Sequence, residues 1–333
     1  MTTKSWISLA TTLAVLLAWQ LAARAGGSAA LALVGTIGMA GVEGRIDHMA
    51  ATPDGRRLFV AALGSDRVLQ IDIQAAQVTG VITGVKEPQG VCYLPKSRKL
   101  VVASGGDGMV RIYDDALKLA GTLSGLDDAD NVRYDPDANL VYVGYGQGAL
   151  AVIDPDKTAI VGKIPLHGHP ESFQLENHGT RIFVNVPAAG EIEVFDRATR
   201  TVLARWPLKD AAANFPMALD EPGRRLFVGT RKPARMMVMD TVAGNEVAIL
   251  NACGDTDDIF YDASRKRIYL SGGEGCVDVF RPADSLTYER LATVRTLRGA
   301  RTSLLVSAAH RLYVAVPHRG AQPAELIVFG TGN

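Results

Sequence analysis

One short strand pattern recurs seven times along the 333-residue chain. Each copy contains an apolar segment, a polar turn and an apolar triplet that begins with Leu, Ile or Val. The triplets begin at residues 58, 100, 141, 182, 226, 268 and 312, so successive copies lie 41 to 44 residues apart. Chance apolar clusters would not keep such a period, and a fixed period of this length is typical of repeat architectures.

Each repeat reads as a set of short strands. A third strand such as "RVLQID" or "EIEVFD" follows every triplet, and six repeats add a fourth, such as "AIVGKIPL". The β-branched residues and the alternation of polar and apolar positions favour strands over helices. Four antiparallel strands per repeat predict a blade of a β-propeller. The sequence therefore predicts an all-β fold, a seven-bladed β-propeller that forms a single domain over residues 26–333.

The two ends of the repeat array predict how the ring closes. The seventh repeat ends at Phe329 without a fourth strand, whereas "ALALVGTIGM" (30–39) precedes the first repeat and reads like a fourth strand. Closure pairs sheet edges that would otherwise stay open. We therefore expect the N-terminal strand to complete the last blade.

The hairpins resemble a known group of propellers. "ATPDGRRLFVA", "NHGTRIFVN" and "DEPGRRLFVG" are similar to the YVTN-type repeats of the YncE-like family of secreted bacterial seven-bladed propellers. "LFVA", "VYVG" and "IFVN" stand where that motif has Tyr-Val-Thr-Asn. The resemblance extends over essentially all of the mature chain and implies the fold. It implies no particular ligand, because members of the family differ in what they bind.

The first 25 residues predict a signal peptide. Lys4 provides a basic start, "WISLATTLAVLLAWQLAA" an apolar stretch, and "ARA" (23–25) the small-x-small pattern before a cleavage site. We expect cleavage after Ala25 and a periplasmic or secreted protein without a stable membrane anchor. The alternative is an uncleaved anchor, for which the apolar stretch is a little short.

The charge balance restricts the expected partners. The formal net charge is zero and no dense Lys/Arg run occurs, which argues against nucleic acid and anionic membrane surfaces. We expect a monomer that binds a protein or a small-molecule ligand.

The chain has three cysteines, and an exported protein can form a disulfide. Cys253 and Cys276 fall in the same repeat and are the expected pair. Cys92 lies in an apolar strand and is expected to be a small core residue.

Alignment of the repeats places one residue of each at the start of the innermost strand. Four of these residues are carboxylates. The expected ring consists of Asp47, Gln89, Asp130, Glu171, Phe215, Asp257 and Thr302. The residues that follow them are His48, Gly90, Asn131, Ser172, Pro216, Asp258 and Ser303. A slip of the alignment by one residue would turn this second set inward instead.

The face of the pore around the ring is the expected ligand-binding surface. His169 belongs to it because it precedes Glu171 by two residues. Arg231 and Lys232 either clamp an anionic ligand or pair with ring carboxylates. The candidate ligand-binding residues are Asp47, His48, Gln89, Asn131, His169, Glu171, Asn214, Arg231, Lys232, Asp257, Asp258 and Arg301.

The carboxylates also suggest a cation site, because crowded like charges raise one another's pKa unless a cation or a hydrogen-bond donor neutralises them. Carboxylate and amide oxygens suit Ca²⁺ or another divalent cation, and the candidate ligands are Asp130, Glu171, Asn214 and Asp257. The pattern is similar to the Glu/Asn/Asn/Asp metal set of gluconolactonase and paraoxonase-like propellers. Those have six blades, and their first-blade Glu is replaced here by Asp47–His48. Polar groups that only face a water-filled channel, and groups for acid–base catalysis, are the alternatives.

Two functions follow as hypotheses. The first is a binding or scaffold propeller that recognises a ligand or partner at the pore face. The alternative is a lactonase-like hydrolase, in which a divalent metal polarises a carbonyl and a ring carboxylate or His48 moves protons. We favour the first, because the sequence offers no decisive nucleophile and no unambiguous metal set, and the fold alone does not specify chemistry.

Overall fold

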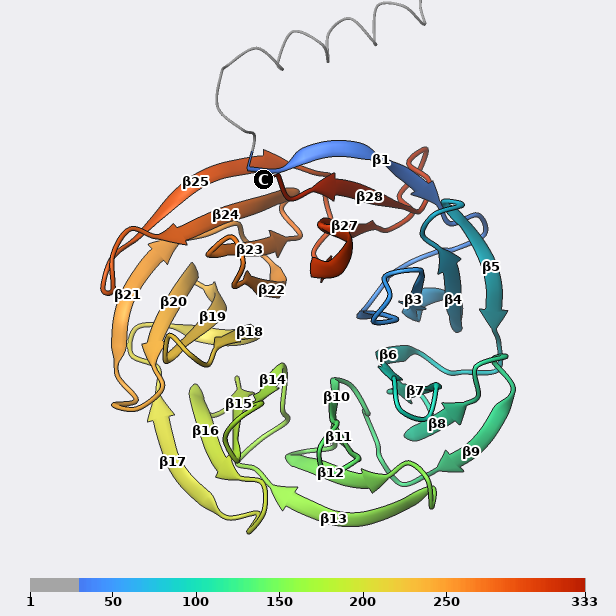
Figure 1. Ribbon diagram of the computed structural model, residues 1–333, viewed down its shortest axis with the longest axis horizontal. Coiled ribbons are helices and arrows are strands. Elements are labelled where there is room, and N and C mark those ends of the chain that lie inside the picture. The colour runs from blue at the N-terminus through green and yellow to red at the C-terminus, as the bar shows by residue number, and fades with distance from the viewer. Residues whose placement is uncertain (1–29, 333) are drawn as a thin grey trace, which may run out of the picture.

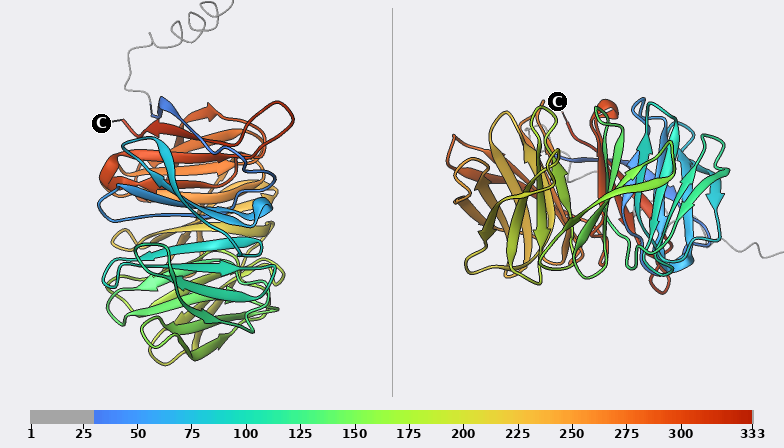
Figure 2. Two further views of the ribbon diagram at one scale, coloured as in Figure 1. Left: turned by 90° about the vertical axis from the view of Figure 1, so that its right-hand side faces the viewer. Right: turned by 90° about the horizontal axis from the view of Figure 1, so that it is seen from below.

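The computed structural model describes residues 30–332, and the expected signal peptide lies outside them. Residues 30–332 form seven four-stranded antiparallel sheets, arranged as blades around a central axis (Figure 1). From the side the ring is a short, thick cylinder (Figure 2). The seven-bladed β-propeller predicted from the repeat is thus confirmed. No helix in this part of the chain is long and apolar enough to cross a bilayer.

Six blades are contiguous in sequence, with strands running from the axis outwards. Blade 1 contains β2 (Met49–Ala51), β3 (Arg57–Ala62), β4 (Arg67–Asp72) and β5 (Gln77–Ile82). Blade 2 contains β6 (Pro88–Leu94), β7 (Lys99–Ser104), β8 (Met109–Tyr113) and β9 (Leu119–Leu123). Blade 3 contains β10 (Val132–Asp135), β11 (Leu140–Tyr145), β12 (Ala149–Asp154) and β13 (Ala159–Pro165).

Blades 4 to 6 follow the same order. Blade 4 contains β14 (Phe173–Leu175), β15 (Arg181–Val186), β16 (Glu191–Asp196) and β17 (Val202–Pro207). Blade 5 contains β18 (Ala212–Asp220), β19 (Arg225–Lys232), β20 (Ala234–Asp240) and β21 (Glu246–Asn251). Blade 6 contains β22 (Thr256–Asp262), β23 (Arg267–Gly272), β24 (Cys276–Pro282) and β25 (Tyr288–Arg295). Short 3₁₀ turns occur at Leu63–Ser65 and Ser307–Ala309.

Blade 7 joins the two ends of the array. It contains β26 (Ser303–Val306), β27 (Arg311–Val316) and β28 (Glu325–Gly330), and its outermost strand is β1 (Ala32–Gly38). β1 pairs antiparallel with β28, with Ile37 opposite Leu326. The N-terminal strand therefore closes the ring, as the sequence predicts (Figure 1).

The core lies between the blades. Because successive side chains of a strand point to opposite faces of its sheet, Phe59 packs toward blade 2, whereas Leu58 and Val60 pack toward blade 7. The same arrangement produces one buried apolar cluster between each pair of neighbouring blades in the described ring. These clusters explain why the apolar triplets of the repeat are needed in every blade.

The structure links Cys253 and Cys276 by a disulfide, with their Cα atoms 6.0 Å apart. The bond ties the start of β24 to the loop that leads into β22, the innermost strand of blade 6. Cys92 is a free thiol. Cys92 is partly buried: it packs against the apolar cluster between blades 2 and 3, and it also lines the space along the axis of the ring.

Candidate functional site at the upper mouth

Two pockets lie along the axis of the ring and meet at His48. The upper mouth, defined as the end at which the innermost strands begin, is a pocket of about 200 Å³. Below it lies the channel pocket, about 410 Å³, which is lined by residues of all seven innermost strands. His48 lines both spaces.

Strand pairing identifies the residue that each blade contributes to the upper mouth. Met49 lies opposite Val60 in blade 1, and the equivalent pair in blade 7 is Ser303 and Val314. In each blade the ring residue lies two positions before the residue that makes this pairing, so the ring residue of blade 7 is Arg301. The upper ring is therefore Asp47, Gln89, Asp130, Glu171, Phe215, Asp257 and Arg301, and all of these residues line the mouth. The prediction of Thr302 for this position is wrong, because the repeat alignment slips by one residue in blade 7.

Most candidate residues from the sequence meet at this mouth. The mouth-lining candidates are Asp47, His48, Gln89, Asp130, His169, Glu171, Arg231, Asp257 and Arg301. Asp258 lines the channel pocket below. Asn131, Asn214 and Lys232 do not line the mouth pocket.

Asn214 points into the wall between blades 4 and 5. Its side-chain amide donates to Asn185 Oδ1 at 2.9 Å and to the Glu191 carbonyl at 3.1 Å. An irregularity in the β18–β19 register between Asn214 and Met217 precedes the regular part of the strand. Such irregularities re-aim side chains, which accounts for the amide lying away from the pore.

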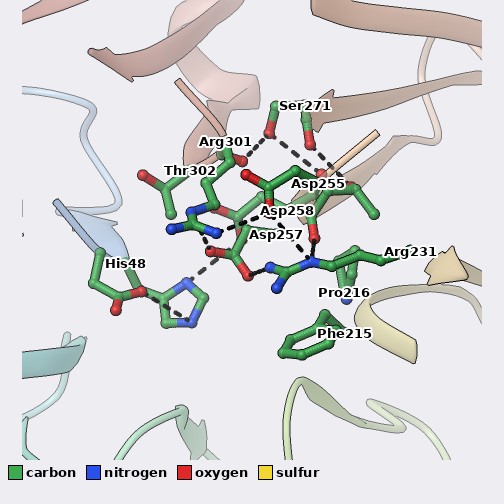
Figure 3. A network of polar contacts seen from close by, with 12 residues as sticks. His48, Phe215, Pro216, Arg231, Asp255, Asp257, Asp258, Ser271, Arg301 and Thr302 are labelled. Atoms are coloured by element: carbon green, nitrogen blue, oxygen red, sulfur yellow. Dashed lines mark hydrogen bonds and ion pairs between the residues drawn. The ribbon is translucent and has the colours of Figure 1, made fainter. Parts of the chain in front are cut away.

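One side of the upper mouth is a closed ion-pair network (Figure 3). The Arg231 guanidinium donates to Asp257 Oδ1 at 2.6 Å, and Arg301 Nε lies 3.4 Å from the other oxygen of the same carboxylate. Arg301 also donates to Asp255 at 2.9 Å. The Arg231 guanidinium carbon lies 3.7 Å from the centroid of the Phe215 ring, a cation–π arrangement. These arginines are engaged by the protein's own carboxylates, which is one of the two outcomes that the sequence left open for Arg231.

Arg45, which sequence reasoning missed, extends this paired side. Its guanidinium donates to Asp47 at 2.8 Å, and Asp47 is almost fully buried. The signal in the sequence is its place two residues before the ring carboxylate. Sequence reasoning also missed Asp255, which lies two residues before Asp257 in the same acidic loop.

The opposite side of the mouth, formed by blades 3 and 4, holds two carboxylates without such partners. Asp130 Oδ1 is buried and accepts no hydrogen bond, and its nearest cationic nitrogen is His48 Nε2 at 3.7 Å. For Glu171, residues 30–332 offer no Lys, Arg or His nitrogen within the 4.0 Å of an ion pair. We call Asp130 and Glu171 the acidic pair.

Both members of the acidic pair hold protons more tightly than ordinary carboxyls. Burial, together with the charges of Asp47 and Asp257, raises the pKa of Asp130 to about 7 although His48 opposes the shift. Burial and the charges of Asp130 and Asp257 raise the pKa of Glu171 well above its usual range. Raised carboxyl pKa values of this kind mean that burial and the neighbouring negative charges together outweigh the nearby cations.

His48 lies among carboxylates on several sides. Its Nδ1 is 3.5 Å from Asp258, and its Nε2 is 3.7 Å from Asp130 and 3.8 Å from Asp47. Burial works against the charged ring, but the hydrogen bond and charge of Asp258, with the charges of Asp47 and Asp130, raise the pKa of His48 to about 10. The imidazolium form is thus the stable one at neutral pH. Charged His48 is therefore unsuited to act as a general base.

His169 and Gln89 complete the rim beside the acidic pair. His169 Nδ1 lies 2.7 Å from the Gly146 carbonyl and 3.6 Å from Asp128. The Gln89 amide donates to the same Asp128 at 3.2 Å. Asp128 is largely exposed, so the rim holds a further negative charge that faces solvent.

The four residues expected to bind a divalent metal do not come together as a set. Asn214 lies in the wall, and Asp257 is held by Arg231 and Arg301. Among residues 30–332, three His, Cys, Asp or Glu ligand atoms approach within 4.8 Å of one another only at His167, Glu191 and Glu193. That cluster lies outside the mouth, and Glu193 already accepts from the His167 backbone N–H and from Arg205. The predicted set therefore does not fit a calcium site.

Comparisons with known proteins support the fold. No family model and no curated protein matches the chain. A chain of Kuenenia stuttgartiensis hydrazine synthase superposes with a TM-score of 0.74 at 18% identity, over 84% of this chain and 96% of that one. A chain in the crystal structure of a mitotic checkpoint complex gives a TM-score of 0.77 at 12% identity, over 93% of this chain and 94% of that one. At these identities the likeness shows the β-propeller fold alone, since one fold hosts many functions.

Proposed function

We propose that this chain is an exported binding propeller of the YncE-like type, whose upper mouth recognises a ligand or partner through a cationic group such as a protonated amine. Export rests on the signal-peptide pattern of residues 1–25, and the family on the YVTN-type hairpins. N-terminal sequencing of the mature protein tests export, with Gly26 as the expected first residue.

The observation that carries the binding proposal is the acidic pair. Asp130 Oδ1 is buried without a hydrogen-bond donor, and Glu171 has no ion-pair partner in the described ring. Unpaired buried carboxylates are costly. A ligand cation placed between the pair would remove that cost, and the fixed carboxylates would orient it by charge-assisted hydrogen bonds.

The arrangement favours an organic cation over the metal-dependent hydrolase. A lactonase-like reaction needs a metal held by several convergent oxygens, and the predicted set does not converge. The mouth also has its arginines paired with carboxylates, so an anionic ligand would have to compete with internal acids.

Thermal unfolding with matched chloride salts tests the proposal. Ethylammonium should raise the Tm of the wild-type protein more than sodium, because a ligand that binds only the folded state stabilises it by mass action. The double variant Asp130→Asn/Glu171→Gln should lose this difference. Asp137→Asn/Glu246→Gln, which changes two exposed carboxylates, is the control and should keep it.

The other outcomes of the same experiment are equally informative. A larger shift with Ca²⁺ than with ethylammonium, abolished by EDTA, would favour the metal-dependent hydrolase instead. Identical melting curves in sodium, ethylammonium and Ca²⁺ would contradict cation recognition at the upper mouth.

A further inference from the structure

A second ring of side chains lies below the upper mouth, three residues further along each innermost strand. The lower ring consists of Ala50, Cys92, Arg133, Gln174, Ala218, Phe260 and Leu304, and all of these residues line the channel pocket. Strand pairing places each opposite the central residue of its apolar triplet, as with Arg133 and Tyr142. Arg133 is the only charged side chain of the lower ring.

Arg133 is poorly satisfied where it lies. Nη1 donates to the adjacent Val132 carbonyl at 2.9 Å, and Nη2 donates to Ser172 Oγ at 3.2 Å. Its guanidinium carbon lies 5.5 Å from the Phe173 ring centroid. In the described part of the chain no carboxylate oxygen lies within 4.0 Å of this guanidinium, in contrast to Arg231 and Arg301 at the upper mouth. Burial lowers the pKa of Arg133, and the opposing charges of Cys92, Asp258 and Asp130 compensate only in part.

The space in front of Arg133 has apolar groups on part of its wall, beside polar groups that include His48 and Asp258. Val132, Leu219 and Phe260 line the same channel pocket. Arg133 also lines an adjoining pocket of about 380 Å³ that extends toward the opposite face, where the β14–β15 and β18–β19 turns lie. The guanidinium thus lies where two adjoining pockets meet, with N–H donors to spare and with both apolar and polar neighbours.

We propose that the lower channel binds a small organic carboxylate with a short apolar body, and that Arg133 is its anchor. A guanidinium fork pairs with a carboxylate through two parallel hydrogen bonds. A bound carboxylate would compensate the charge that the protein leaves unpaired. The apolar body of the ligand would lie against the hydrophobic walls. This site is separate from the acidic pair and does not depend on the proposed function.

Cys92 provides a direct reporter of occupancy, because it lines the same pocket and is the free thiol of the chain. Burial raises the pKa of Cys92 to about 11, so alkylation by iodoacetamide should be slow and is best followed at mildly alkaline pH. Propionate, the probe, should slow alkylation by about twofold at a concentration equal to its Kd, by mass action. Sodium chloride at equal ionic strength should protect less.

Variants separate an anchor from a structural residue. Arg133→Met should fold and melt at the same or higher temperature, because an apolar side chain replaces an unpaired charge, and propionate should no longer protect Cys92. Arg133→Lys should retain weaker protection. Arg56→Met, which changes an arginine that is 80% exposed, should behave as wild type. Propionate should still protect Cys92 in Asp130→Asn/Glu171→Gln.

Two results would overturn the proposal. One is an alkylation rate of wild-type Cys92 that propionate and chloride change equally. The other is protection that survives in Arg133→Met. If propionate failed to protect Cys92 only in the Asp130→Asn/Glu171→Gln variant, anion binding would belong to the upper mouth and the lower site would be refuted.

Discussion

His48 Nδ1 lies 3.5 Å from the carboxylate of Asp258, at the level where the upper mouth meets the channel pocket. The imidazolium therefore separates an acidic mouth from a channel whose lower ring carries the opposite charge, on Arg133. The two spaces differ in the charge of ligand that they favour, although they share one axis.

The first prediction concerns His48→Gln. The folded-state pKa of about 10 is raised above the unfolded value near 6.5. The His48 contribution to the free energy of unfolding is therefore complete below pH about 6.5 and is lost as the pH rises through about 10. The variant should be destabilised by about 3 kcal/mol at pH 6, because it leaves buried carboxylates without their cation. Urea unfolding at pH 6, 8 and 10 measures this, with His318→Gln as the control. An equal loss at pH 6 and pH 10 would contradict the pairing.

The second prediction concerns Asp130→Asn. Because the folded pKa of Asp130 is raised to about 7, the folded state binds more protons than the unfolded state between pH about 4 and 7, and stability falls over that range. The variant removes this penalty and should be more stable than wild type by about 1 to 3 kcal/mol at pH 8, with little difference at pH 4. Asp137→Asn, an exposed change in the same blade, should differ little at either pH. If Asp130→Asn were less stable than wild type at pH 8, the Asp130 carboxylate would have to be compensated by a favourable contact, and the prediction would be wrong.

The third prediction tests ring closure by β1. Ile37 is 3% exposed in the cluster between blades 7 and 1, whereas Leu33 on the same strand is 54% exposed. Ile37→Ala should cost about 2 to 4 kcal/mol, and Leu33→Ala should change the free energy of unfolding by about 0.5 kcal/mol or less. Equal, small effects would mean that β1 does not seal the last blade.

The fourth prediction concerns the disulfide. Thiol titration of the denatured, unreduced protein should return one thiol, that of Cys92, and the reduced protein should return three. Reduction should lower the free energy of unfolding by about 3 kcal/mol, mainly because the unfolded chain gains freedom. Three thiols before reduction would exclude the bond.

The sequence predicts the blades well because most of the strands of each blade come from one continuous stretch of the chain. Each apolar triplet has to fill the space between two sheets, so Leu58, Phe59 and Val60 have equivalents every 41 to 44 residues. Ring closure by residues 30–39 follows from the same count of strands. The ring carboxylates Asp47, Asp130, Glu171 and Asp257 are also found by alignment, since each lies at or just before the start of an innermost strand.

The interior of the site could not be predicted in the same way. Register irregularities at Pro88/Gly90, Asn214/Met217 and Thr256/Asp258 alter the direction of side chains at the start of these strands. This is why Asn214 leaves the pore. The pairing of Arg301 and Arg231 with Asp257 joins neighbouring blades, and spacing along the chain does not report such contacts. Arg133 is visible as a polar residue in the sequence, but its lack of a carboxylate partner is a three-dimensional property.

The central claim is that the acidic pair receives a cation, and proton release on binding tests it most directly. At pH 6 Asp130 is mostly protonated, because its pKa is about 7. A bound cation favours the ionised carboxylate, so binding of ethylammonium should release protons at pH 6 and fewer at pH 8. Calorimetric titration in buffers of different ionisation enthalpy measures this release. The affinity for ethylammonium should rise from pH 6 to pH 8. Binding heats that do not depend on the buffer, or titrations that are unchanged in Asp130→Asn/Glu171→Gln, would contradict the claim.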